Sequence, residues 1–127
     1  MARPNWEYIR IDVLLPEHPK MDGLSDKAVV TLLQLWCWCG LNRTDGFVRD
    51  AKWKTFGTPA ARDQLLRAPP GFKYGWAERV DGGYLMHDYT GPDGHQRTRA
   101  EIEELSARRA AAGRKGGRAR GKPQASA

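Results

Sequence analysis

The spacing of apolar residues predicts one long amphipathic helix in the first third of the chain. In SDKAVVTLLQLWCWCGLN, residues 25–42, apolar positions recur at intervals of three and four, as on the buried side of a helix. Ser25 can cap the unpaired N–H groups of the first turn, and Asp26 favours the positive end of the helix dipole. The predicted buried residues are Ala28, Val29, Leu32, Leu33, Trp36, Cys39 and Gly40.

The segment before this helix has the composition of a strand followed by a loop. NWEYIRIDVLL, residues 5–15, is rich in the aromatic and β-branched residues that are typical of strands, and Pro16 ends it. Residues 16–25 contain two prolines and a glycine, which indicate a loop.

Turn and capping residues divide the stretch after the long helix into short elements. Asp45-Gly46 ends that helix and leaves Phe47 and Val48 as a very short strand. Residues 49–57 are predicted to form one or two helical turns that stop at the final glycine.

A second short helix is predicted over residues 58–68. Thr58 is its N-cap, and Pro59 occupies the first helical position, where its missing N–H costs nothing. Leu65 and Leu66 are expected to face inward, and the PPG that follows ends the helix.

The last elements are a hairpin and a third longer helix. WAERV and GYLMHDY flank a DGG turn, which is typical of a β-hairpin. Thr98 and Glu101 can form a capping box that starts a helix over residues 98–112. Glycines beyond it predict a flexible coil; they are Gly113, Gly116, Gly117 and Gly121.

The order of these elements predicts an α+β fold. A long helix, a short strand, two short helices and a hairpin follow one another as in a winged helix-turn-helix domain. The predicted units are a winged-helix domain with an extra N-terminal strand (1–96), a C-terminal helix (97–112) and a basic, disordered tail (113–127). An unrelated small α+β domain could share this order.

Charge is unevenly distributed along the chain. Residues 1–106 contain 14 Lys and Arg against 15 Asp and Glu, whereas residues 107–127 contain seven basic residues and no acidic one. A near-neutral body with a cationic end is a layout of nucleic-acid binders, in which the end attracts phosphates without reading bases. The alternative is a solvated end that only keeps the protein soluble.

The order of elements also assigns candidate DNA contacts to individual residues. In a winged helix the second short helix faces the major groove, so the base-facing candidates are Arg62, Gln64 and Arg67. Asp63 and Arg67 could instead form an i,i+4 pair on an ordinary solvated face. The phosphate candidates are Lys52, Lys54, Lys73, Arg79, Arg108, Arg109, Arg114, Lys115, Arg118, Arg120 and Lys122.

Neither a metal site nor a catalytic site is predicted. Cys37 and Cys39 point about 200° apart on a helix, so they cannot both bind one ion, and they are expected to be buried structural cysteines. His87 and Asp88 are expected to face opposite ways, with Asp88 capping the next turn. No nucleophile or phosphate-binding glycine loop accompanies them, so we expect neither an enzyme nor a cofactor.

The five tryptophans are expected to differ in burial. Trp36 lies on the apolar stripe and is predicted to be core, whereas Trp38 lies off it and is either packed or at a partner interface. Half-buried supporting positions are expected for Trp6, Trp53 and Trp76.

Four stretches follow one another along the chain in a recurring layout: HPKMDGLSDKA, TDGFV, GGYLMHDY and TRAEIEELSARRAAAGRKGGRARG. In this order they resemble a family of small proteins of actinobacterial phages and their hosts, described as replication-initiation or replisome-organiser-like. The resemblance implies a winged-helix N-terminal part, a basic tail, and DNA binding at an origin or regulatory site.

The predicted function is therefore DNA binding in replication initiation or regulation, with double-stranded DNA as the partner. The alternative is a module that binds a host or replisome protein through the helix over residues 98–112. The longest apolar stretch is too short for a membrane span, and no signal peptide or disulfide framework is visible. A cytoplasmic location is expected.

Overall fold

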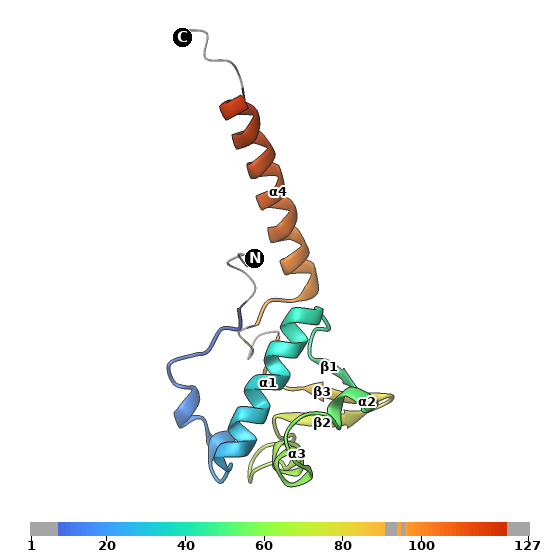
Figure 1. Ribbon diagram of the computed structural model, residues 1–127. Coiled ribbons are helices and arrows are strands. Elements are labelled where there is room, and N and C mark those ends of the chain that lie inside the picture. The colour runs from blue at the N-terminus through green and yellow to red at the C-terminus, as the bar shows by residue number, and fades with distance from the viewer. Residues whose placement is uncertain (1–7, 91–93, 95, 122–127) are drawn as a thin grey trace.

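The computed structural model describes residues 8–90, 94 and 96–121, excluding the side chains of 116–121, and it is a mixed α+β structure (Figure 1). Three strands form one antiparallel sheet in the order β1-β3-β2. The elements are two 3-10 helices (η1, Leu15–Glu17; η2, Pro19–Met21), then α1 (Asp26–Asn42), β1 (Phe47–Arg49), α2 (Asp50–Trp53), α3 (Pro59–Leu66), β2 (Ala77–Val80), β3 (Gly83–Met86) and α4 (Arg99–Gly121).

Helix α1 begins at the predicted cap, but its buried side is turned relative to the prediction. The Ala28 N–H donates to Ser25 Oγ at 3.1 Å, which confirms the cap. Thr31 and Leu35 are buried, whereas Val29, Leu33 and Gly40 are only half-buried. Burial of the Thr31 hydroxyl is possible because it donates to the Lys27 carbonyl at 2.7 Å.

The α2–α3 connection requires glycine at position 57. Gly57 has a φ of +54°, and a Cβ there would lie 2.3 Å from Thr31 Oγ1. Thr58 then caps α3 by accepting from the Ala61 N–H at 3.2 Å, and Pro59 begins the helix as predicted. This tight connection brings α3 against α1.

The predicted hairpin is confirmed. β2 and β3 are joined by Asp81-Gly82, and β3 also pairs with β1, with Val48 opposite Tyr84. The Tyr84 ring stacks on Trp53 with centroids 4.0 Å apart, so the sheet is packed against α2.

The predicted N-terminal strand is absent from the described residues 8–14, where the chain is irregular before η1. Within this segment the backbone of Arg10 bonds to a side chain and not to a neighbouring strand. The Arg10 N–H donates to Gln96 Oε1 at 2.8 Å, and Gln96 Nε2 donates to the Arg10 carbonyl. In Figure 1 this segment passes on the side of α1 opposite the sheet, so it cannot join a sheet edge.

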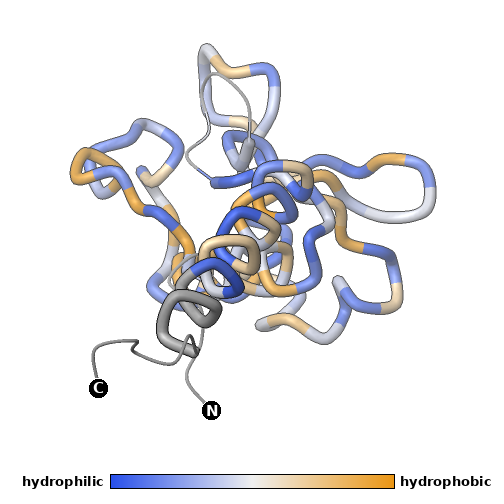
Figure 2. The backbone as a smooth tube through the Cα atoms, turned by 90° about the horizontal axis from the view of Figure 1, so that it is seen from above, coloured by the Kyte–Doolittle hydropathy of each residue, from blue (hydrophilic) through white to orange (hydrophobic). Residues whose placement is uncertain are grey.

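Helix α4 continues well beyond the predicted boundary near residue 112. It begins as expected, with the Glu101 N–H donating to Thr98 Oγ1 at 3.1 Å. A flexible coil was predicted from residue 113 onward. That prediction is wrong for residues 113–121, because the backbone is helical to Gly121. Ile102, 6% exposed, anchors the base of α4, and the rest of the helix projects from the body (Figure 1). Figure 2 looks nearly along this projecting helix.

Three tryptophans form part of the core. Trp36, predicted to be core, is 3% exposed, and its ring lies edge-on to Trp76 with centroids 5.8 Å apart. Trp53 and Trp76 are also buried, so the expectation of half-buried positions was wrong for both. Trp53 stacks on Tyr84 of β3, and Trp76 lies against Trp36 of α1. Trp6 lies outside the described residues.

Candidate nucleic-acid interface

Two of the three predicted base-facing side chains make contacts within the body. Arg62, half-buried, donates from Nη1 to the Phe56 carbonyl, which braces the α2–α3 connection. Gln64 Oε1 accepts from the Ser25 N–H at 2.8 Å, which joins α3 to the start of α1. Arg67, just after α3, is exposed. Of the three, only Arg67 can reach a ligand without losing an internal hydrogen bond.

The phosphate candidates of the body lie in different electrostatic settings. Lys54 and Lys73 are exposed, the latter with its Nζ 5.3 Å from the Tyr74 ring centroid. Arg79 donates to both Asp50 carboxylate oxygens, at 2.7 and 3.2 Å, and this pairing raises the pKa of Arg79. Pairing with Asp50 already neutralises the Arg79 charge in part, so Lys54 is the better phosphate candidate.

A pair of cations over one indole ring was missed in the sequence. Arg49 and Lys52 lie 5.9 and 6.0 Å from the Trp38 ring centroid, and Lys52 also lies 5.4 Å from the Phe56 ring. Trp38 is half-buried against Phe56, which answers the question of its environment. Arg49 and Lys52 are three residues apart at the start of a predicted helix, and this spacing was the only signal of the pair in the sequence.

The charges of α4 change along its length. Near its base, Arg99 pairs with Glu103 and Arg108 pairs with Glu104. From residue 105 onward α4 contains no acidic residue, and the described side chains of Arg109, Arg114 and Lys115 are exposed. The side chains of Arg118 and Arg120, and the whole of Lys122, lie outside the described part. The outer half of α4 is therefore a cationic rod.

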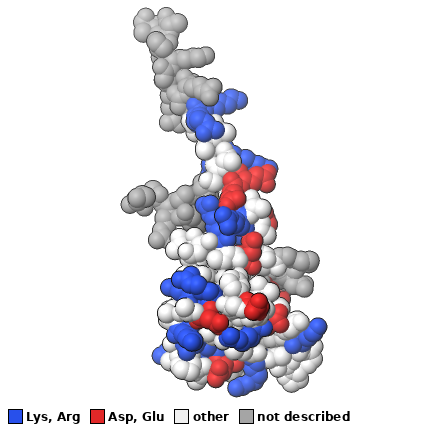
Figure 3. All heavy atoms as spheres, turned by 90° about the vertical axis from the view of Figure 1, so that its right-hand side faces the viewer, with Lys and Arg blue, Asp and Glu red and all other residues white. Residues whose placement is uncertain are grey.

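The space-filling view separates this rod from the body. Figure 3 shows blue and red atoms intermixed over the body and the base of α4, and blue atoms further out along the helix. The body thus presents mixed charge on this side, whereas the outer half of α4 presents positive charge alone.

A buried ion pair connects the N-terminal segment to the end of the hairpin. Lys20, 7% exposed, lies with Nζ 2.6 Å from Asp88 Oδ2 and donates to the Gly75 carbonyl at 3.1 Å. Asp88 was expected to cap the following turn, part of which lies outside the described residues; its Oδ2 pairs with Lys20. His87 turns away from Asp88, as predicted, and stacks on Tyr74 with ring centroids 4.3 Å apart.

The two cysteines have different environments. Cys39 is buried, and burial raises the pKa of its thiol to about 11. Cys37 is exposed, so the expectation that both are buried was wrong for it. No group of three or more His, Cys, Asp or Glu that could bind a metal is found within the described ranges.

This difference predicts selective alkylation. In the native protein, iodoacetamide at pH 8 is expected to modify Cys37, while Cys39 stays protonated and enclosed. Peptide mapping by mass spectrometry should find one labelled site in the native protein and both sites after denaturation. Equal labelling of both cysteines in the native state would contradict the burial of Cys39.

Comparison with protein-family models, with curated proteins and with solved structures found no match. The resemblance to phage replication-initiation proteins therefore stays a prediction. Among the described residues, no helix is both long and apolar enough to span a membrane.

Proposed function

We propose that this protein binds double-stranded DNA, through the outer half of α4 and through a face of the body formed by α2, α3 and the hairpin. The observation that carries the proposal is the separation of charge. All 15 acidic residues lie before residue 107, and seven cations follow. A cationic rod without carboxylates attracts the phosphate backbone and releases its counterions.

The topology supports a winged-helix assignment for the body. The order α1-β1-α2-α3-β2-β3 and the sheet order β1-β3-β2 match that architecture, in which α3 would approach the major groove and the hairpin would lie along the backbone. On this face Arg67 and Lys54 are exposed, and we assign them the leading contacts. Arg62 and Gln64 instead position α3.

The direct test is binding of the full chain to a random duplex, measured by fluorescence anisotropy from 50 to 300 mM salt. Affinity should fall steeply with salt, because counterion release supplies most of the binding free energy. Absence of binding at 50 mM salt would exclude the proposed function.

The body contact is tested with Arg67→Ala. Loss of a groove contact should weaken binding to a selected sequence by about 1–3 kcal/mol and weaken binding to random duplex less. Asp63→Ala is the matched control, since it removes an exposed acidic side chain one turn earlier, on α3, and should not weaken binding. Equal losses on both duplexes with Arg67→Ala would make this residue a phosphate contact instead.

A second candidate function, binding of a protein partner, is supported by exposed apolar side chains. Val30 and Leu41 on α1 are 52% and 61% exposed, and Val13 is 91% exposed. The helix over residues 98–112, which the sequence analysis named for this role, offers less apolar surface, because the exposed described residues of α4 are charged, alanine or glycine. If a variant that no longer binds DNA still binds a protein partner, this second function would be favoured.

A further inference from the structure

We propose that one molecule binds two separate DNA duplexes, one on the α2–α3–hairpin face and the other along the outer half of α4. This inference rests on the proposed function and goes beyond it. The outer half of α4 could equally add its charge to the same duplex that the body binds. The structure argues against that arrangement through the positions of the two basic regions.

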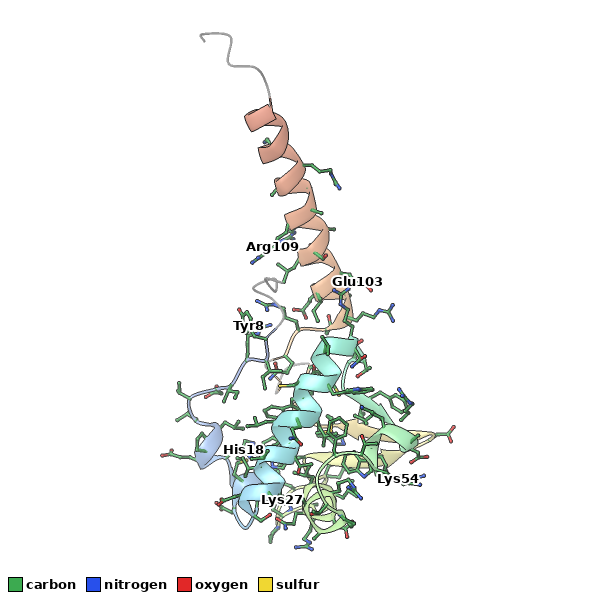
Figure 4. All side chains as sticks on the ribbon, in the orientation of Figure 1. Tyr8, His18, Lys27, Lys54, Glu103 and Arg109 are labelled. Atoms are coloured by element: carbon green, nitrogen blue, oxygen red, sulfur yellow. The ribbon has the colours of Figure 1, made fainter. Side chains whose placement is uncertain are left out.

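Helix α3 and the outer half of α4 lie at opposite ends of the molecule, and α2 and the hairpin lie beside the middle of α1 (Figure 1). Gln64 bonds to the Ser25 N–H, so α3 lies at the start of α1. The Arg99 N–H donates to Asp45 Oδ1 at 2.6 Å, so α4 begins just past the other end of α1. The 17 residues of α1 span about 25 Å, and Arg108 lies about 14 Å further along α4. Figure 4 shows Lys54 on the lower part of the body and Arg109 part-way up α4.

The base of α4 is held in its direction by several contacts. Ile102 is buried, the Arg99 N–H is bonded to Asp45, and the preceding Gln96 makes two hydrogen bonds to the Arg10 backbone. Bending α4 back toward α3 would break these contacts. The outer half of α4 is therefore directed away from the body face rather than along it.

Acidic residues also interrupt the basic surface between the two regions. Glu101, Glu103 and Glu104 lie at the base of α4, where Glu103 pairs with Arg99 and Glu104 with Arg108, and Figure 3 shows red and blue atoms intermixed there. A phosphate backbone crossing this zone would meet carboxylates. Because a duplex is stiff over such lengths, one duplex that contacts both basic regions must run straight past these carboxylates. Two separate duplex segments need not.

The experiment is a capture assay with the full chain. An immobilised random duplex is loaded with protein, and retention of a second, labelled duplex is measured. The arm variant carries Arg108→Gln, Arg109→Gln, Arg114→Gln and Lys115→Gln, and the body variant carries Lys54→Glu and Arg67→Glu. The two are matched, since four neutralisations and two reversals change the net charge equally.

The expected result is that each variant still binds the immobilised duplex, while capture of the second duplex falls at least tenfold with either one. A mixture of the two variants should not restore capture, because both regions must belong to one molecule. Restoration by the mixture, or capture unaffected by the body variant, would overturn the inference and indicate associated copies.

The outcomes also separate the inference from the proposed function. A full chain that binds the immobilised duplex and never captures a second one overturns the inference alone. A full chain that binds neither duplex overturns both. Circular dichroism of the two variants checks that the fold is retained.

Discussion

Ending the chain after Ser106 is expected to weaken binding to random duplex DNA sharply and to flatten its salt dependence. The deletion removes seven cations and leaves a body with 14 basic and 15 acidic residues. At about −0.9 per phosphate neutralised, seven contacts give a slope of at most about −6 in log affinity against log salt, and partial contact should halve it. Affinity measured from 50 to 300 mM salt for both lengths gives the two slopes.

The truncated chain should remain folded, because every described side chain between Ala107 and Lys115 is exposed and Ile102 is retained. Any preference for a particular DNA sequence should survive, since the cations removed would contact phosphates and not bases. Identical slopes for the two lengths would mean that the end of the chain is only a solvated helix. The protein-partner function would then be favoured.

Lys20→Ala is expected to destabilise the body strongly. The substitution leaves the Asp88 carboxylate, 23% exposed, without its cation, and it empties the space beside the Trp76 and Phe72 rings. Removing one partner of a buried pair costs about 3–5 kcal/mol, and the partial exposure of Asp88 favours the lower end. For a domain of this size the midpoint of thermal unfolding should fall by roughly 10–20 °C.

Arg79→Ala is the matched control, because it breaks an ion pair of similar length at the surface. Arg79 and Asp50 are 60% and 40% exposed, so water can solvate the remaining carboxylate and stability should change little. Equal shifts in the two variants, measured by differential scanning calorimetry, would show that Lys20 is not part of a buried cluster. The Lys20 side chain lies in a stretch that the sequence indicated only as a loop.

Local signals predicted most of the secondary structure correctly. The caps at Ser25 and Thr58 and the turn at Asp81-Gly82 appear where expected, whereas α2 ends at Trp53, before the predicted stop at Gly57. Each depends on hydrogen bonds or backbone angles within about four residues, so the nearby sequence contains the necessary information. The order of the elements follows from these signals, and with it the α+β class.

Tertiary contacts decided the structure at positions where the local sequence pattern allowed more than one conformation or contact. Residues 8–14 have strand composition, yet Gln96, 86 positions from Arg10, takes the backbone groups that a neighbouring strand would take. Arg62 and Gln64 lie on the helix that was predicted to face the groove, yet their partners are Phe56 and Ser25.

The sequence by itself therefore determined the helices, the hairpin and the concentration of charge after residue 106. Only the tertiary structure decided that this charge lies on a helix directed away from the body. That direction depends on Ile102 packing and on the bond from Arg99 to Asp45, a partner 54 positions away. Such contacts are absent from local periodicity, because they form only when the chain has brought distant segments together.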